Sequence, residues 1–477
     1  MIIDRYKYFL VILAGIGIFF LVYAPHFSYP YPLHVDEWHH ITEALKLGSG
    51  EYTSGSFGLE IGFHLFLYLL SKFFDLISVY KFLPAIWAVF SSLTLFYVVM
   101  KKSRNFWISF FAMIFFASIK SNVNILGLWF FTPLTFSIPF IFLYIHFFSE
   151  GLARENKKYI LISFGIMFFL IFVHSISVFF SAMFLIFTAF YYRSYIFKEW
   201  KFFSLFIFIP VTGALFYKQL FNLNFSELFI NIFSALQFKT GWTIFELDNS
   251  FFEIYSLIGY FLAFIGFFYL VFSKLKRVSY ITYLFWPLML LLSIFLYRVI
   301  DVSYFSPYQR NLYYFALSLP LLSAFGMNLI IEKFASNKYY ISNAKFIFNR
   351  FLSFLLIVLF LLSSFVSYYE LPSGLKIYHL IEDSDLEALD YLSELKHTKV
   401  MAPKDVSNAL YALTGHEPVG ALYFYGNGEA VDLFFSSECD VKEDILEEQE
   451  VEYVFSREPI DCGWELVFNN RRYVYKR

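Results

Sequence analysis

The stretch that decides the fold is "YKFLPAIWAVFSSLTLFYVVMKK", residues 80–102. It has no charged residue between Lys81 and Lys101, and an α-helix needs about 20 mainly apolar residues to cross the hydrocarbon core of a bilayer. Lys101 and Lys102 stand together where the apolar run ends. Paired cations in this position are typical of a membrane helix that ends on the cytoplasmic side.

The composition extends this interpretation to the whole chain. Of the 477 residues, 59% are hydrophobic and 16% are charged, and the mean hydropathy is +0.61. A soluble domain has roughly 25% charged residues, and no soluble core could enclose 69 Phe and 37 Tyr. The class is therefore an α-helical polytopic membrane protein, for which we expect no nucleic-acid partner. No small-residue cleavage site follows the first apolar run, so we expect this run to be retained as a membrane helix.

Apolar runs of suitable length predict eleven membrane helices. They are expected at 6–24, 80–100, 106–119, 128–148, 159–173, 175–192, 201–217, 251–272, 279–298, 311–331 and 349–368. One further run, 57–74, contains Glu60, His64 and Lys72. A charged group in lipid costs about 2.5–3.5 kcal/mol. We therefore expect this run to lie along the outer membrane surface as a juxtamembrane helix.

The distribution of basic residues supports this count. With eleven spans and a cytoplasmic N-terminus, the inner segments contain 18 Lys and Arg, and the outer segments of the membrane domain contain eight. If 57–74 were counted as a span, every later loop would lie on the opposite side of the membrane. Most of the Lys and Arg residues would then be outside, against the positive-inside rule. The sequence thus predicts a multi-pass cell-membrane protein whose first external loop (25–79) and C-terminal segment are both extracytoplasmic.

The C-terminal segment differs in charge from the rest of the chain. From Glu370 onward there are 22 acidic and 10 basic residues, which predicts a second domain. Helical periodicity in 383–396 and 405–415, followed by short apolar runs such as "VEYVFSR" (451–457), indicates an α/β fold. We therefore expect a transmembrane domain at 1–370 and an external α/β domain at 371–477.

Both cysteines of the chain, Cys439 and Cys462, lie in the predicted external domain. We expect them to form a disulfide, because disulfides persist in oxidising compartments outside the cytoplasm. Two buried free thiols are the alternative.

A cluster of ionisable residues, "HVDEWHH" (34–40), follows the first predicted span. Asp36 begins a predicted helix that ends near Gly48, so a role in capping is one interpretation. Asp36 and His40 are four residues apart and share a helix face, which favours a reactive carboxylate. The His-Glu-x-x-His spacing of zinc proteases is absent. A metal-free general base is the preferred interpretation, and a divalent metal held by Asp36, Glu37 and His40 is the alternative.

Four stretches of the chain follow one another in a recognisable order. They are "VDEWHH" (35–40), "GLEIGFHLFLYLL" (58–70), the opening stretch (80–102) and "YFSPYQRNLYYFALSLPLLSAFGM" (304–327). Their arrangement resembles that of the GT-C glycosyltransferases, which take sugars from polyprenyl-phosphate carriers on the external membrane face. The resemblance covers most of 1–370 and extends to the external α/β domain, and it implies a GT-C-like fold of about eleven transmembrane helices.

The resemblance implies a role for each matching residue. Asp36 is expected to be the catalytic base that deprotonates the acceptor hydroxyl, with Glu37 as its partner. Arg310 is expected to face the phosphate of the donor, where a guanidinium stabilises the charge that develops as the glycosidic bond breaks. Further candidates for substrate binding are Glu60, His40, Lys218 and Lys239.

Departures from the family narrow the expected reaction. The oligosaccharyltransferase subunits of this superfamily carry a second acidic motif in the next outer loop and a Trp-Trp-Asp motif in their external domain. Here "IKSNVNILGLW" (119–129) has no acid, and the C-terminal segment has no Trp-Trp-Asp. This favours transfer of a monosaccharide from a single lipid phosphate, with inversion, to a lipid, glycan or protein acceptor.

Two other functions remain as alternatives. A lipid-linked glycan flippase or transporter would also work in the membrane, but ion-coupled carriers place ionisable groups near the midplane, and the predicted spans contain almost none. A glycan polymerase would share the external basic residues without needing the Asp36–Glu37 pair. No cofactor is expected for the preferred reaction, and a requirement for a divalent metal is the alternative.

Overall fold

The structure of the chain is a computed structural model. It describes residues 2–52, 60–122, 125–204, 224, 226–227, 230, 237–238, 253–304, 306–335, 379–422 and 426–477. The chain divides into two compact units, each built from separate stretches of sequence. The first unit contains Met1–Tyr23, Pro84–Trp129 and Pro133–Glu370, and the second contains Ala24–Leu83, Phe130–Thr132 and Leu371–Arg477. The functional division of the chain at residue 371 stays a prediction.

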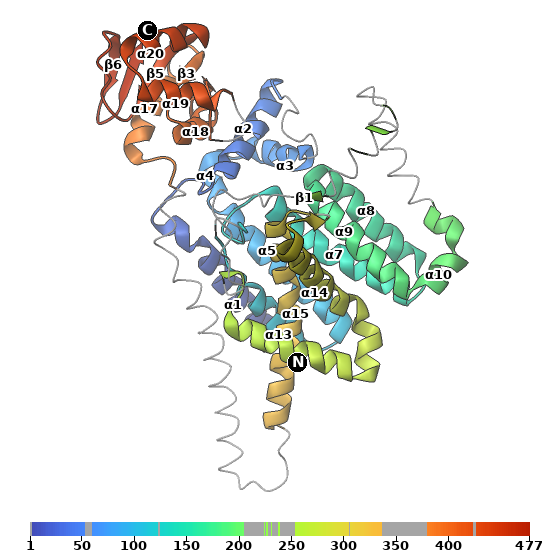
Figure 1. Ribbon diagram of the computed structural model, residues 1–477. Coiled ribbons are helices and arrows are strands. Elements are labelled where there is room, and N and C mark those ends of the chain that lie inside the picture. Colours follow the sequence, from blue (N-terminus) through green and yellow to red (C-terminus); the bar gives the residue numbers. More distant parts are fainter. Residues whose placement is uncertain are drawn as a thin grey trace. The chain divides into compact units, whose positions relative to one another are not determined.

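The first unit is a helical bundle (Figure 1). Its helices are α1 (Ile2–Tyr23), α5 (Leu83–Ser103), α6 (Phe106–Phe116), α7 (Pro133–Ala153), α8 (Lys157–Val173), α9 (Ser175–Tyr191), α10 (Arg193–Lys198), α13 (Leu257–Phe272), α14 (Lys274–Ile300) and α15 (Tyr308–Ala335). A two-stranded antiparallel pair, β1 (Gln237–Phe238) with β2 (Ser303–Tyr304), accompanies them.

Five helices within the described residues are long and apolar enough to cross a membrane. They are Lys7–Phe27, Leu83–Ser103, Pro133–Ala153, Tyr280–Ile300 and Tyr308–Lys333. Four more predicted spans correspond to the shorter helices α6, α8, α9 and α13. The predicted span 349–368 lies outside the described residues, as does most of 201–217. The helical membrane fold is confirmed, and the count of eleven stays a prediction.

Close helix packing holds the centre of the bundle. A Cβ atom added to Gly266 of α13 would lie 1.9 Å from the carbonyl oxygen of Leu322 in α15, and one added to Gly326 would lie 2.0 Å from that of Leu262. The two backbones therefore meet directly at a pair of glycines. Small residues allow this approach in membranes, where helix association depends on packing rather than on the hydrophobic effect.

The second unit combines the first loop segment with the C-terminal segment. Its N-terminal elements are η1 (Ala24–Phe27), α2 (Val35–Ser49), α3 (Ile61–Ser71) and α4 (Leu76–Tyr80). Helix α3 has 11 residues, which extend only about 16 Å at 1.5 Å per residue, roughly half of the hydrocarbon thickness. Helix α6 has the same length, so the assignment of 57–74 to the membrane surface stays a prediction.

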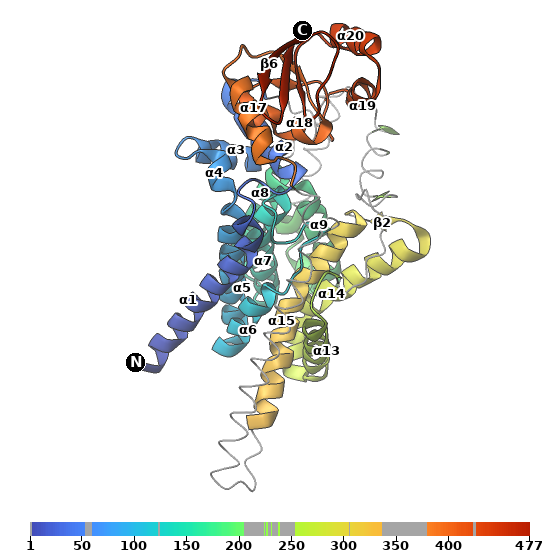
Figure 2. The ribbon, with the colours of Figure 1, turned by 90° about the vertical axis from the view of Figure 1, so that its left-hand side faces the viewer.

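The C-terminal segment forms a five-stranded mixed sheet with four helices around it (Figure 2). In chain order its elements are α17 (Asp383–Ser393), β3 (Lys399–Met401), α18 (Lys404–Thr414), β4 (Glu417–Pro418), α19 (Gly428–Ser436), α20 (Cys439–Glu448), β5 (Val451–Ser456), β6 (Glu465–Asn469) and β7 (Tyr473–Lys476). The strand order is β4-β3-β5-β7-β6. Strand β3 runs parallel to β4 and β5, and the pairs β5–β7 and β6–β7 are antiparallel.

The expected α/β fold and the expected disulfide are both confirmed. Cys439, at the start of α20, is bonded to Cys462 between β5 and β6. Helix α19 and strand β4 were not predicted. The two residues of β4 carry too little pattern to be recognised, and "GEAVDLFFS" (428–436) follows a stretch rich in Gly and Tyr that reads as a loop.

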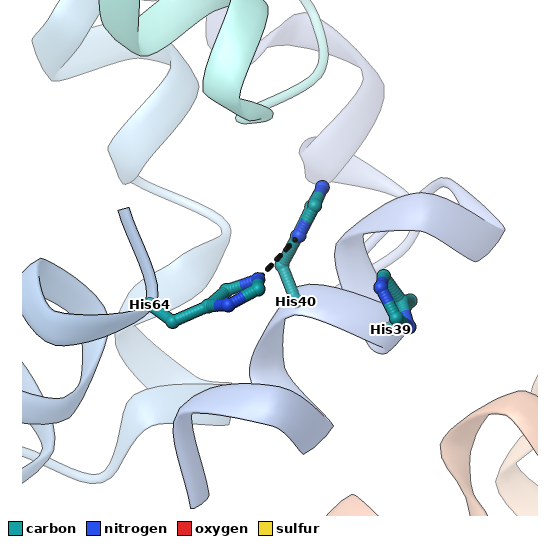
Figure 3. A group of neighbouring side chains, drawn as sticks. All are labelled: His39, His40 and His64. Atoms are coloured by element: carbon teal, nitrogen blue, oxygen red, sulfur yellow. Dashed lines mark hydrogen bonds between the residues drawn. The ribbon is translucent and has the colours of Figure 1, made fainter. Parts of the chain in front are cut away.

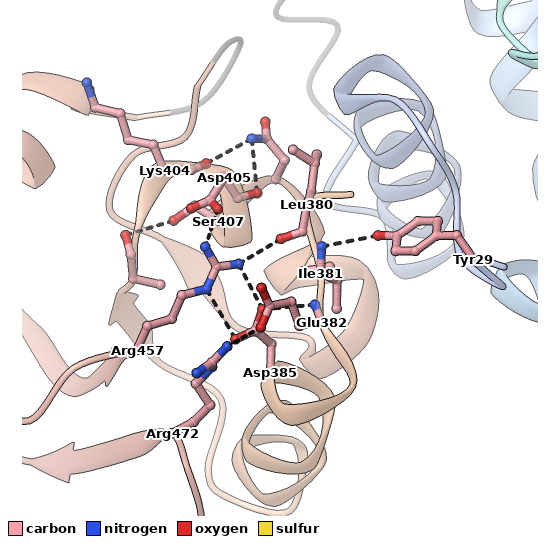
Figure 4. Close-up of polar contacts among 12 residues, drawn as sticks. Tyr29, Leu380, Ile381, Glu382, Asp385, Lys404, Asp405, Ser407, Arg457 and Arg472 are labelled. Atoms are coloured by element: carbon pink, nitrogen blue, oxygen red, sulfur yellow. Dashed lines mark hydrogen bonds and ion pairs between the residues drawn. The ribbon is translucent and has the colours of Figure 1, made fainter. Parts of the chain in front are cut away.

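Within the second unit, the C-terminal segment docks on the first loop segment through polar contacts. Lys46 of α2 forms an ion pair of 2.7 Å with Glu417, and the Tyr411 hydroxyl of α18 donates a 2.7 Å hydrogen bond to Glu51. The backbone N–H of Ile381 donates to the Tyr29 hydroxyl at 3.2 Å (Figure 4). Segments more than 350 residues apart in the chain therefore build one compact body.

A buried carboxylate organises the C-terminal domain (Figure 4). The side chain of Asp385 has no exposed surface and accepts hydrogen bonds from Arg457, at 2.8 and 3.2 Å, from Arg472 and from the backbone N–H of Glu382 at 3.0 Å. Burial alone would raise the pKa of Asp385. The donors from Arg457, Glu382 and Arg472 outweigh burial, and the pKa is lowered from its usual value.

Asp385→Asn should lower the free energy of unfolding by about 3 kcal/mol at pH 7, because it removes the buried carboxylate that pairs with the partly buried guanidinium groups of Arg457 and Arg472. A lowered pKa gives stability that is present above the unfolded-state pKa and is lost as pH falls through the folded-state value. The difference from wild type should therefore shrink toward acid pH. Thermal and denaturant unfolding of the full chain across pH measure this.

Asp432→Asn is the matched control. Asp432 pairs with Lys404, but its side chain is 68% exposed, so this change should cost less than about 1 kcal/mol. Equal losses in the two variants, or a loss in Asp385→Asn that does not change with pH, would contradict the buried network.

Candidate active site

The cluster at 34–40 forms the first turn of α2. His34 is the N-cap residue, and its Nδ1 accepts a hydrogen bond from the backbone N–H of Asp36 at 3.1 Å. Glu37 completes a capping box, because its Oε2 accepts from the backbone N–H of His34 at 3.0 Å. The helix ends at Gly50, in the left-handed conformation at φ 80°, two residues beyond the expected Gly48. Asp36 lies near the helix start as predicted, but His34 and Glu37 satisfy the cap.

Glu37 is a fully buried carboxyl with three backbone partners. Besides His34, the N–H of Leu33 donates to its Oε2 at 2.7 Å, and the N–H of Phe131 donates to its Oε1 at 2.7 Å. Phe131 is 94 residues away in the chain, and its carbonyl also accepts a hydrogen bond from Tyr80. Burial raises the pKa of Glu37 to about 8, although the three N–H donors act in the opposite direction. Glu37 therefore positions the start of α2.

Asp36 differs from its neighbour in access to solvent. Its side chain is 26% exposed, whereas Glu37 has no exposed surface. Its Oδ2 lies 3.6 Å from Nδ1 of His34, and it stands in the first turn of α2. Of the two adjacent acids, Asp36 is the one that solvent can reach.

The other acid predicted for this loop, Glu60, lies close to His40. Glu60 is the N-cap residue of α3, and its Oε2 is 4.0 Å from Nδ1 of His40. The same nitrogen of His40 lies 3.0 Å from Nε2 of His64. The structure therefore brings together Glu60 and His40 and adds His64, which the sequence analysis assigned no role.

Arg310 lies in the first unit, in the first turn of α15, and is partly buried. Its backbone N–H donates to the carbonyl of Pro307 at 2.9 Å. Burial and the positive charge of Arg310 lower the pKa of His174, at the junction of α8 and α9, to about 3. His174 is therefore neutral at physiological pH.

Buried hydroxyl groups extend the polar surroundings of Arg310. The Ser177 hydroxyl is 2.7 Å from Nδ1 of His174, 2.9 Å from the Tyr314 hydroxyl and 3.0 Å from the Ser137 hydroxyl. Tyr314 is four residues after Arg310 and so shares its face of α15. Sequence reasoning missed Ser177 and Tyr314. For Tyr314 the four-residue spacing was a usable signal, whereas Ser177 is 137 residues from Tyr314.

The remaining predicted residues are distributed as follows. Asp36, Glu37, His40 and Glu60 belong to the second unit and Arg310 to the first. Lys218 and Lys239 lie outside the described residues. The catalytic and binding roles of all these residues stay predictions.

Glu37→Gln should lower the free energy of unfolding by about 2 kcal/mol, because an amide offers one acceptor oxygen to three N–H donors and leaves at least one buried donor unsatisfied. Asp36→Asn is the matched control on the adjacent residue, and its partly exposed side chain should change stability by less than about 0.5 kcal/mol. Unfolding of the purified protein in detergent compares the two. A loss of similar size in both variants would show that the two acids do not differ in structural role.

Comparison with known proteins finds likeness in structure alone. No known family profile matches the chain, and no curated protein sequence matches it. Among solved structures, the archaeal oligosaccharyltransferase AglB from Archaeoglobus fulgidus, in complex with an inhibitory peptide and a dolichol-phosphate, is 12% identical with a TM-score of 0.60. That likeness covers 95% of this chain and 69% of the other.

Two further structures show the same likeness. The Archaeoglobus fulgidus oligosaccharyltransferase in complex with Zn and sulfate is 13% identical, with a TM-score of 0.58 and coverage of 94% of this chain and 68% of that one. ArnT from Cupriavidus metallidurans bound to undecaprenyl phosphate is 12% identical, with a TM-score of 0.55 and coverage of 98% of this chain and 97% of that one. These proteins are GT-C glycosyltransferases. The resemblance read from the sequence is confirmed, and the chain has the GT-C glycosyltransferase fold.

Proposed function

We propose that the protein is an integral-membrane glycosyltransferase that moves a sugar from a polyprenyl-phosphate carrier to an acceptor at the external membrane face. The likeness to ArnT supports this proposal, since it extends over 98% of this chain and 97% of that enzyme, whose complex contains undecaprenyl phosphate. AglB, the second neighbour, was solved with a dolichol-phosphate. Both complexes contain a long-chain lipid phosphate, the kind of carrier that the reaction would use.

The observation that carries the mechanism is the contrast between two adjacent acids. Glu37 is buried and accepts hydrogen bonds from three backbone N–H groups, whereas Asp36 is partly exposed at the same helix start. A general base must reach the proton that it removes. Glu37 is then a positioning residue that fixes the first turn of α2, and Asp36 is the base.

In this mechanism Asp36 accepts the proton of the acceptor hydroxyl. The acceptor oxygen attacks the anomeric carbon from the face opposite the phosphate, and the bond between that carbon and the phosphate oxygen breaks. The configuration at the anomeric carbon is inverted, and the polyprenyl phosphate leaves with an additional negative charge. The donor is a monosaccharide on a single lipid phosphate, and the acceptor is a lipid, a glycan or a protein.

Arg310 is assigned to the phosphate of the donor. Arg310 is partly buried, its positive charge acts on His174, and the Ser177 hydroxyl connects His174 to Tyr314. A planar guanidinium offers two parallel donors to a phosphate, and this interaction strengthens as charge develops on the leaving group. The remaining candidates are assigned to contacts with the sugar or the carrier; they are Glu60, His40, Lys218 and Lys239.

The mechanism contains no step through a metal ion. One structural neighbour was solved with Zn and sulfate, which makes a divalent metal plausible for a protein of this fold. In the set of Asp36, Glu37 and His40, both carboxyl oxygens of Glu37 accept backbone N–H bonds. Such a set would need further donors to complete a metal site. We therefore derive catalysis from Asp36 as a base.

Asp36→Asn should lower the turnover of sugar transfer by a factor of about 10² or more, because the amide keeps the size of the side chain but cannot accept the acceptor's proton. Donor binding and thermal stability should be retained. The assay is sugar transfer by the purified protein in lipid, with and without a chelator. Unchanged turnover would end the assignment of the base. Activity that is abolished by chelation and restored by Mn²⁺ or Mg²⁺ would make Asp36 a metal ligand.

Arg310→Ala should weaken donor binding and also lower turnover, because the phosphate contact is present in the ground state and strengthens as the bond breaks. Arg310→Lys should recover only part of the loss, since one ammonium cannot replace a two-pronged contact. Arg298, whose Nε donates to the Tyr308 hydroxyl at 2.8 Å, gives a control variant, Arg298→Lys, that should leave donor affinity within about twofold. Donor affinity unchanged in Arg310→Ala would refute the phosphate assignment.

A further inference from the structure

Three buried histidines gather in the second unit, between α2 and α3 (Figure 3). His39 and His40 are neighbours on α2, and His64 lies one turn into α3. Their exposed fractions are 3%, 5% and 4%. One ring nitrogen from each residue lies within 4.8 Å of those of the other two. Within the described residues, this is the group whose side chains fit a metal-ligand set.

We propose that His39, His40 and His64 bind a transition-metal ion of the Zn²⁺ class, with Glu60 as the fourth ligand. Imidazole nitrogen is a preferred donor for Zn²⁺, Cu²⁺ and Ni²⁺ and a poor one for Mg²⁺ and Ca²⁺. The site differs from the set of Asp36, Glu37 and His40 considered for catalysis and shares one residue with it. It does not depend on the proposed transfer reaction.

Two distances between the proposed ligand atoms can be compared with those of a tetrahedral site. With Zn–N bonds of about 2.0–2.1 Å, two nitrogens on one tetrahedral zinc are about 3.3 Å apart. Nδ1 of His40 and Nε2 of His64 are 3.0 Å apart, and Oε2 of Glu60 is 4.0 Å from the same Nδ1. His39 is the ligand that must move most, by rotation of its ring toward the pair. A shift of the order of 1–1.5 Å closes the difference between 4.8 Å and the tetrahedral spacing.

The second ring nitrogen of His64 has a partner of its own. The Tyr52 hydroxyl is 3.2 Å from Nδ1 of His64, the ring nitrogen opposite the one that faces His40. A hydrogen bond from Nδ1–H to this hydroxyl leaves the lone pair of Nε2 for the metal, which is the usual outer-shell arrangement of a histidine ligand.

A bound ion would join α2 to α3 and so fix the helix that carries Asp36. Zn²⁺ should therefore raise the thermal stability of the protein, whereas Mg²⁺ at the same concentration should not. The role is structural, and variants of His39 and His64, which the proposed function does not use, should lose stability and metal content without losing a contact with a substrate.

The test is metal analysis of the purified full-length protein after chelator treatment and return of Zn²⁺. We expect one zinc per chain that survives dialysis. His40→Gln and His64→Gln should weaken zinc affinity by at least about 100-fold, and Tyr52→Phe should weaken it by about 10-fold, as loss of outer-shell partners does. His397→Gln, at an exposed histidine of the C-terminal domain, and Asp36→Asn should leave zinc affinity unchanged.

Three results would overturn the proposal. The first is that the wild-type protein takes up no stoichiometric zinc, and the second is that both His40→Gln and His64→Gln retain zinc. The third is that Asp36→Asn loses zinc while His64→Gln keeps it. This third result would assign the ion to the set of Asp36, Glu37 and His40. If a histidine variant fails to fold, Co²⁺ added to the wild-type protein decides the question. Strong visible absorption of tetrahedral Co²⁺, reduced in Tyr52→Phe, supports the site, and weak octahedral absorption refutes it.

Discussion

The carboxyl of Glu37, with three backbone N–H groups around it, is the interaction on which the proposed chemistry depends. It joins the residues before α2, the first turn of α2 and the segment at Phe131. A carboxyl removed from water loses solvation free energy, and only donors held in fixed positions restore it. The chain supplies these donors from backbone that has little freedom to move. The position of Asp36 follows from this arrangement, since it is the preceding residue on the same rigid turn.

The structure also explains why an acid pair is useful where a single acid would not be. One member accepts the backbone hydrogen bonds and is removed from solvent, so the other can remain partly exposed without a structural role. The second cluster, around Arg310, is built differently. There the charge of Arg310 acts on the neutral His174, and the Ser177 hydroxyl connects His174 to Tyr314.

Much of the fold could be predicted from the sequence, because its signals are local. Helices α5, α7, α14 and α15 follow from apolar runs of about 20 residues, and α18 follows from its periodicity and from Gly415. The Cys439–Cys462 bond followed from the expected compartment. The different roles of Asp36 and Glu37 could not be predicted, because adjacent acids look alike until Phe131 is placed next to one of them.

The same limit applies to the three histidines. His64 reads as a core residue of a short helix, and nothing local connects it to His40, which is 24 residues away. Two of the buried partners of Ser177, Ser137 in α7 and Tyr314 in α15, are likewise far from it in the chain and could not be connected to it from the sequence. Contacts that depend on tertiary structure were missed, and features that depend on neighbouring residues were found.

The second unit has a consequence for how the protein is made. Its first part, 24–83, is synthesised early, but the Tyr411 and Glu417 side chains that pair with Glu51 and Lys46 come more than 300 residues later. At about 5–20 residues per second, the ribosome needs on the order of 15–70 seconds to reach them. For that time the first loop segment waits without its docking partner while the membrane helices are inserted. The second unit is therefore completed late in synthesis, and a chain truncated anywhere before residue 411 would leave the polar surface of α2 uncovered for a chaperone or a protease to recognise.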